Sequence, residues 1–144
     1  MQGSGAMKHV YAEDVNYWQT STSEPDAWIA RAKAEIKSAG GVVMGEAFGQ
    51  DADGRSAYML AFAFGTEQFR AVWPVLPSKT RNERAARIQA ATMLYHDIKA
   101  KCVAAKVHGA RAAFFPYLLL SDGRVASAAT EPALMDAWPK LLTG

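Results

Sequence analysis

One long, alanine-rich stretch, residues 80–109, constrains the fold more than any other part of the chain. Thr80 and Glu83 have the spacing of a capping box, and Gly109 supplies the left-handed residue that ends many helices. Apolar residues recur between these two signals at steps of three and four, which places them on one helical face: Ile88, Ala91, Tyr95, Ile98, Cys102 and Ala105. The pattern predicts a single amphipathic helix.

The opposite side of this helix is less apolar, but it is not a fully polar surface. It carries Gln89, Met93, His96, Ala100, Val103 and Val107. A helix that is apolar on more than one side usually lies between two layers or at an oligomer contact. We expect one of these two environments here.

Three strand-like runs precede the helix, at residues 42–48, 56–64 and 67–76. Asp-Gly turn chemistry in residues 50–55 and the pair Gly65-Thr66 separate them, which predicts an antiparallel meander. A two-residue turn at Gly65 sets Phe64 opposite Glu67 and Tyr58 opposite Trp73, so one sheet face is large and aromatic. The small residues of the long helix complement this face in volume, and we expect the helix to cover it.

The remaining elements complete an α+β fold. Ser23 and Asp26 suggest a second capping box, for a helix over residues 24–39, and residues 9–18 read as an irregular or helical arm. Residues 112–120 suggest a helical turn leading to a short strand, residues 124–127 a returning strand, and residues 132–142 a terminal helix. We expect one domain over residues 7–144: a three-stranded antiparallel meander packed against one long helix, with additional helices at both ends. Residues 1–6 resemble an expression-tag remnant.

Composition restricts the class of protein. Half of the 144 residues are apolar, enough for a sizeable core, and no apolar run approaches the roughly 20 residues that span a bilayer. The single cysteine excludes an internal disulfide and indicates a reducing, cytoplasmic setting. The net charge of +2 permits contact with nucleic acid without requiring it.

No pattern in the sequence predicts an enzyme, a metal site or a cofactor. Tyr95, His96 and Asp97 are consecutive on a helix, so they point roughly 100° apart and cannot converge on one atom. The three histidines are scattered without zinc spacing. Residues 51–54 match only the start of a calcium loop and are better explained as a hairpin turn.

Nucleic-acid binding is the function that the charged and aromatic residues favour. Basic residues crowd the start of the long helix and recur seven apart along it, where they could grip phosphates, and strand aromatics could stack bases. The alternative is that the charges form a solvated face and the rings belong to the core. The predicted contact residues are Arg70, Lys79, Arg81, Arg84, Lys99, Lys106 and Trp73.

Several sequence segments of the chain resemble a group of small proteins of unknown activity encoded by phages and prophages. These segments are residues 61–76 (AFAFGTEQFRAVWPVL), 98–101 (IKAK), 115–124 (FPYLLLSDGR) and 138–142 (WPKLL). Residues 111–115 (RAAFF) depart from the group, which has more acidic residues there. The resemblance implies an accessory protein carried on mobile DNA and transfers no catalytic residue.

These observations lead us to expect a non-enzymatic accessory protein that contacts nucleic acid, with single-stranded DNA as one candidate, or a DNA-processing partner. One alternative is a homo-oligomeric interaction module that uses the second helix face or the small sheet face. Another is a small-molecule-binding protein with a pocket between the sheet and the long helix.

Overall fold

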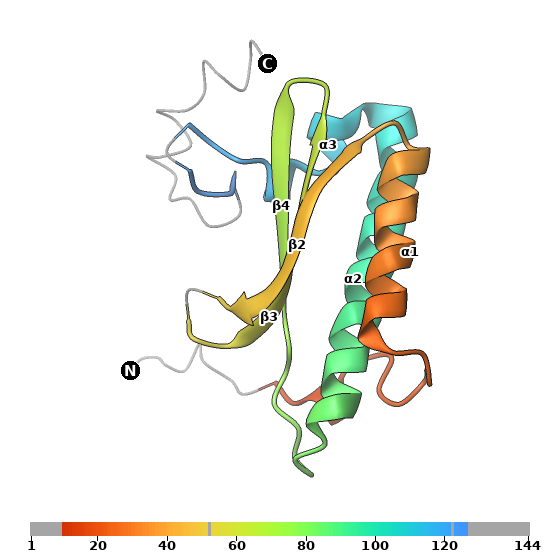
Figure 1. The fold of residues 1–144 in the computed structure, drawn as a ribbon, viewed down its shortest axis with the longest axis vertical. Coiled ribbons are helices and arrows are strands. Elements are labelled where there is room, and N and C mark those ends of the chain that lie inside the picture. Colours follow the sequence, from red (N-terminus) through yellow and green to blue (C-terminus); the bar gives the residue numbers. More distant parts are fainter. Residues whose placement is uncertain (1–9, 52, 122, 127–144) are drawn as a thin grey trace.

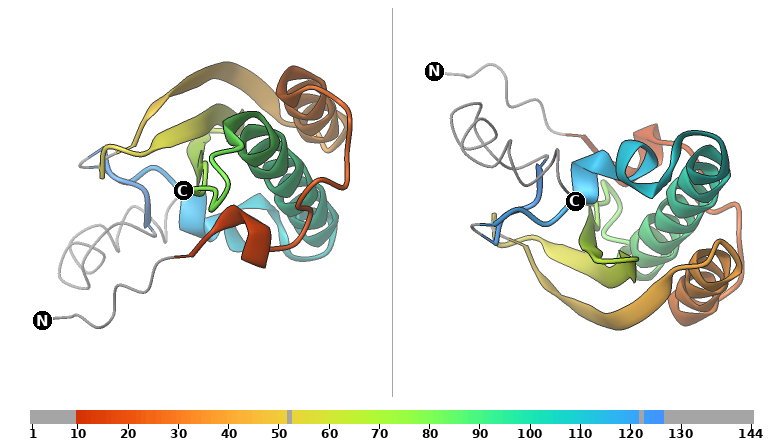
Figure 2. Two further views of the ribbon diagram at one scale, coloured as in Figure 1. Left: turned by 90° about the horizontal axis from the view of Figure 1, so that it is seen from below. Right: turned by 90° about the horizontal axis from the view of Figure 1, so that it is seen from above.

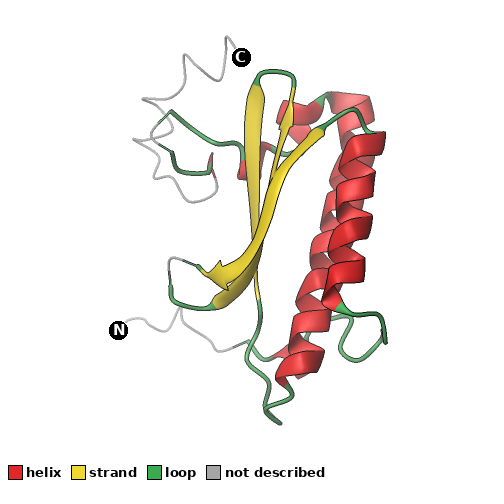
Figure 3. Cartoon of the chain, in the orientation of Figure 1, coloured by secondary structure: helices red, strands yellow, loops and turns green. Residues whose placement is uncertain are grey.

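The computed structural model describes residues 10–51, 53–121 and 123–126, and shows the α+β architecture expected from the sequence (Figures 1 and 3). The predicted terminal helix at 132–142 and the predicted tag remnant lie outside the described residues. In the described part, no helix is both long enough and apolar enough to cross a membrane. The elements are η1 (Ala12–Asp14), α1 (Pro25–Ser38), β2 (Val42–Gln50), β3 (Ser56–Phe64), β4 (Glu67–Pro74), α2 (Glu83–His108), α3 (Ala110–Ala113) and η2 (Phe115–Tyr117).

The three strands form an antiparallel sheet in the order β2-β3-β4, and the predicted register is confirmed. Phe64 lies opposite Glu67, and Tyr58 lies opposite Trp73. Gly65 adopts the left-handed conformation at φ +61° that the tight turn requires. β2 is longer than predicted and continues to Gln50, whereas β4 ends earlier, at Pro74, because proline cannot donate to the ladder.

A short strand-like segment and a returning segment follow the helical turns, as the sequence suggested, and an isolated bridge joins the first of them to β4. Leu118 bridges to Phe69 of β4, and Leu119 bridges to Val125 of the returning segment. The Leu119 amide donates to the Gln68 carbonyl at 2.9 Å. The helical turns α3 and η2 therefore lead into a strand-like segment, and the described part of the chain ends beside it.

The predicted packing of the long helix on the aromatic sheet face is also confirmed. Phe62 and Phe69 are 0% and 1% exposed, and they pack with Leu94 and Ile98 of α2 in one core. Phe114, which follows α3, fills the centre of this face at 5.0 Å from Phe62 and 5.8 Å from Phe69, measured between ring centroids. α1 packs beside α2 on the same side of the sheet (Figure 2).

Two predicted helix caps are wrong. The helix α2 begins at Glu83 and not at Thr80, and its N-cap is Asn82, whose side chain accepts from the Ala85 amide at 3.1 Å. Thr80 lies two residues before this cap, in a loop where its hydroxyl donates to Glu13 at 3.0 Å. At α1 the N-cap is Glu24, which makes no side-chain cap bond, and the Ser23 amide instead donates to the Ser21 hydroxyl.

The N-terminal arm encloses the first half of α2 on the side away from the sheet (Figure 2). Gln89 is fully buried, and its Nε2 donates to the carbonyls of Ala12, Val15 and Asn16 at 2.8–3.1 Å. Over this half of α2, the side opposite the sheet therefore packs against the arm. The helix lies between two layers there, which is one of the two environments expected from the sequence. The second half of the same side is open, because Val103 and Val107 are exposed.

Glu13 fastens the arm to the loop before α2. Its carboxylate accepts from the Ser78 hydroxyl at 2.6 Å, the Lys79 amide at 2.9 Å, and both the amide and the hydroxyl of Thr80. Burial raises the pKa of this carboxyl, but the donors that surround the ionised form outweigh burial and lower the pKa to about 2.

We expect Phe62→Ala to lower the free energy of unfolding by about 3–5 kcal/mol, because it removes the ring at the centre of the core. Phe48→Ala is the control, since Phe48 is 43% exposed and should cost less than about 1.5 kcal/mol. Equilibrium denaturation with guanidinium chloride measures both values. Equal losses for the two variants would contradict the described packing.

The pKa of Glu13 predicts a pH-dependent contribution to stability. A folded-state value of about 2 lies below the ordinary 4.5, so the carboxylate stabilises the fold above pH 4.5 and loses this effect as the pH falls toward 2. Glu13→Gln should therefore be less stable than the wild type at neutral pH, and the difference should shrink as the pH is lowered through this window. A difference that does not change with pH in urea denaturation series would contradict the assignment.

Candidate nucleic-acid interface

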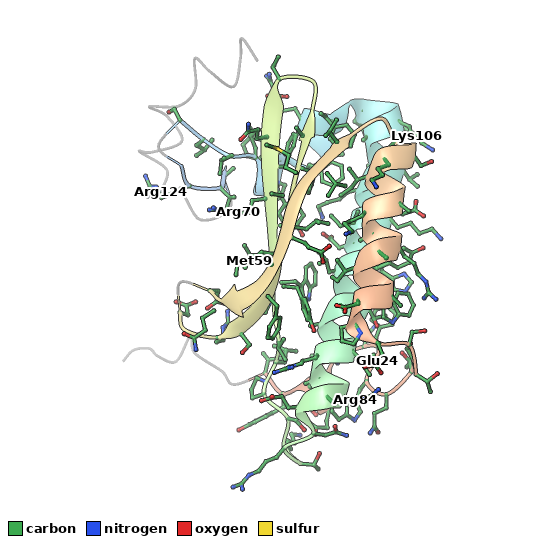
Figure 4. The ribbon with its side chains drawn as sticks, in the orientation of Figure 1. Glu24, Met59, Arg70, Arg84, Lys106 and Arg124 are labelled. Atoms are coloured by element: carbon green, nitrogen blue, oxygen red, sulfur yellow. The ribbon has the colours of Figure 1, made fainter. Side chains whose placement is uncertain are left out.

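The structure does not bring the seven predicted contact residues onto one surface. Lys79, Arg81 and Arg84 lie at the start of α2, whereas Lys99 and Lys106 lie along its second half. Figure 4 shows Arg84 and Lys106 at opposite ends of the helical layer, and Arg70 with Arg124 on the far side of the sheet. Trp73 is half-buried and packs against the core. Phe69, another aromatic residue of β4, is fully inside the core.

Most of the basic residues at the start of α2 are neutralised by ion pairs. Lys79 binds Asp14 at 3.0 Å, Arg87 binds Glu83 at 3.1 Å, and Arg84 pairs with Glu24. Arg81 is the exception, because it forms no ion pair with any residue of the described ranges. This end of the molecule is therefore poorly suited to attract a phosphate backbone over its whole area.

A cluster of half-buried rings lies on the helical layer, between the arm, α1 and α2. Tyr17 stacks on His96 with a centroid separation of 4.8 Å and an interplanar angle of 10°. Trp28 contacts Tyr95 at 5.3 Å and His96 at 5.9 Å. Tyr95 and His96 are consecutive residues of α2, and both lie at the edge of the helix face that packs against α1. This position explains why both rings join the cluster.

Two exposed basic residues border this cluster, and a third lies further along α2. The Arg31 guanidinium lies 4.4 Å above the Trp28 ring, and the Lys99 ammonium lies 5.9 Å from the Tyr95 ring. Lys106, two turns beyond Lys99, is exposed on the same side of α2. Within the described chain none of the three forms an ion pair, so their charge is available to an anion. We call this group the ring–cation surface: Tyr17, Trp28, Arg31, Tyr95, His96, Lys99 and Lys106.

Sequence reasoning found only Lys99 and Lys106 of this surface. Trp28 and Arg31 were detectable as an i, i+3 pair on one helix, and Tyr95 and Lys99 as an i, i+4 pair on the other. The two pairs become one surface only when α1 packs beside α2. No sequence pattern indicated Tyr17, because the contact of its ring with His96 depends on the conformation of the irregular arm.

The reactive residues of α2 have structural partners instead of a catalytic arrangement. Asp97 accepts from the Tyr117 hydroxyl and from Lys101, whose Nζ lies 2.6 Å away. Burial first, and then the Asp97 carboxylate, raises the pKa of the Tyr117 phenol far above its usual range. Burial also raises the pKa of the Cys102 thiol to about 11, which removes the reactive thiolate at neutral pH.

The possible metal ligands of the described chain are not grouped into a site either. In residues 10–51, 53–121 and 123–126, no three His, Cys, Asp or Glu side chains are placed to hold a metal ion. The Asp51 carboxylate accepts from the amides of Asp53 and Arg55, both at 2.9 Å, as expected of a hairpin turn.

Comparison of the chain with protein-family models, curated proteins and solved structures finds no match in any of the three. The resemblance to small phage and prophage proteins stays a prediction. The geometry of the surfaces therefore supports a binding function, and a link to mobile DNA is supported by the resemblance alone.

Proposed function

We propose that this protein is a non-enzymatic accessory protein of mobile DNA that binds single-stranded nucleic acid through the ring–cation surface. The observation that carries the proposal is the placement of two cations without ion pairs, Arg31 and Lys99, against four clustered rings, with Lys106 two turns further along the same side of α2. Single-strand binding proteins combine these two elements, because cations follow the phosphates while rings stack on bases.

The arrangement favours a single strand over a duplex. Each ring of the cluster is half-buried, so an edge or a face stays accessible to a base that has left its own stack. Base stacking on an aromatic side chain contributes about 1–3 kcal/mol per base and tolerates any sequence. Lys99 and Lys106 are roughly 10 Å apart along the helix axis, which lets one strand contact both.

We expect a fluorescently labelled single-stranded oligonucleotide to bind the wild type at low salt. With three phosphate contacts, the affinity should fall roughly 20-fold between about 50 and about 200 mM salt. Lys99→Glu combined with Lys106→Glu should abolish binding, and Tyr17→Ala should cost about 1–3 kcal/mol. Fluorescence anisotropy measures all three effects.

The matched control for this titration is Arg70→Glu combined with Arg124→Glu. It changes the net charge by the same amount, but both residues lie across the sheet from the ring–cation surface (Figure 4). Circular dichroism verifies that each double variant is folded. Equal loss of binding in the two double variants, or no binding by the wild type at low salt, would contradict the proposal.

A second candidate function is self-association through the edge strand β2. One edge of β2 has no partner strand in the described chain, and Val42 and Met44 on this strand are 64% and 54% exposed. Edge strands are often protected from pairing by charged residues, proline or a bulge; β2 has no lysine or proline, and its protection is limited to Glu46 and an irregularity between Val43 and Gly45. Antiparallel pairing of two β2 strands would give a continuous sheet across a two-fold axis.

Self-association predicts a sedimentation mass that is twice the 15.6 kDa of one chain. Val42→Lys with Met44→Lys should shift the protein to the monomer, because charge on the edge opposes pairing. Val107→Lys, at an exposed position on α2, is the control and should leave the mass unchanged. A wild type that sediments as a monomer at high concentration would exclude this function.

A further inference from the structure

A hollow of about 690 Å³ lies where the end of the sheet meets the first turns of α2. Its apolar floor is formed by Val75, Leu76, Pro77 and Ala86. This hollow is distinct from the pocket expected between the aromatic sheet face and the long helix, because that face is filled by the phenylalanine core. It is also separate from the ring–cation surface, with which it shares no residue.

The rim of the hollow carries more positive than negative charge. Arg55, Arg81 and Arg87 line it, together with one carboxylate, that of Glu83. Arg55 is held by Asp51 and Asp53 at 3.4–3.7 Å, and Arg87 is held by Glu83. Arg81 is held by no carboxylate of the described chain and is exposed. One guanidinium at the rim is therefore free to meet an anion.

A second donor at the rim is also unsatisfied. The Nε of Arg87 is buried and has no hydrogen-bond partner among the described residues. A buried donor without an acceptor is unfavourable, but this atom is closed to solvent and does not face an incoming ligand as it stands. The Arg87 guanidinium lies 4.8 Å from the centroid of the Phe48 ring, and Phe48 does not line this hollow, so Arg87 contributes charge to the rim and no free donor.

The backbone that presents Arg81 is held in place by the same network that fastens the arm. Arg81 adopts φ +60°, a left-handed conformation that a side chain like arginine rarely takes. Its amide donates to the Ser78 carbonyl at 3.2 Å, and Ser78 also donates to Glu13. Strained residues of this kind are maintained where the surrounding structure fixes them, often at binding sites.

We propose that this hollow binds a small organic anion that joins an apolar body to an oxyanion head, either a carboxylate or a phosphate. The apolar body would rest on the floor between Val75 and Ala86. The oxyanion would accept hydrogen bonds from the Arg81 guanidinium, which is exposed and has no carboxylate partner among the described residues. Neither of these two contacts depends on nucleic-acid binding by the ring–cation surface.

The test titrates three probes into the isotope-labelled full-length protein and follows its amide resonances by NMR. Phenyl phosphate should shift the Leu76, Arg81 and Ala86 amides in a saturable way. Inorganic phosphate lacks the apolar body, and benzyl alcohol lacks the charge, so each should bind at least about tenfold more weakly. Absence of saturable shifts at these amides, or equal binding of phenyl phosphate and inorganic phosphate, would overturn the proposal.

Variants assign the interaction to the named residues. Arg81→Gln should weaken phenyl phosphate binding by at least about tenfold, and Arg81→Lys should retain part of it. Arg84→Gln removes the same charge from a neighbouring position that does not line the hollow, and it should bind like the wild type. An equal loss in Arg81→Gln and Arg84→Gln would overturn the assignment. The Lys99→Glu, Lys106→Glu protein should still bind phenyl phosphate, so failure of one proposal is distinguishable from failure of the other.

Discussion

The contact between a layer of phenylalanine rings and the small residues of α2 is the constraint on which the rest of the structure depends. Phe62, Phe69 and Phe114 meet edge to face or offset-stacked, and the alanines at positions 90 and 91 let the helix backbone approach them closely. These rings fill the centre of this sheet face in the described part of the chain. The two candidate binding regions lie elsewhere, one on the outside of the helical layer and one at the end of the sheet.

Packing on this layer also decides which parts of α2 are free. Its first half is enclosed by the sheet, α1 and the arm, with Gln89 as the buried link to the arm. Its second half extends beyond the arm, and four residues are exposed there: Lys99, Val103, Lys106 and Val107. The start of the same helix, fixed by Glu13, forms one wall of the hollow. One element thus carries two separate candidate binding regions, and both are supported by the arm.

The sequence was sufficient for the features that depend on local periodicity and turn chemistry. The two-residue turn at Gly65 was enough to predict the pairing of Phe62 with Phe69, and hence the aromatic face. The start of α2 was mispredicted because Thr80 belongs to a loop that binds Glu13, 67 residues away, a contact that no local pattern contains. The ring–cation surface was found only in part for the same reason, since Trp28 and His96 meet through the packing of two helices.

The most direct test of this account is whether the phenylalanine layer lies under α2 in solution. Nuclear Overhauser spectra of the labelled protein should show cross-peaks from the ring protons of Phe62 and Phe69 to the methyl groups of Leu94 and Ile98, because all four residues belong to one buried cluster. Such cross-peaks, with slow amide exchange through residues 88–102, are the predicted result. Rings without contacts to α2, or fast exchange near the middle of the helix, would contradict the central claim.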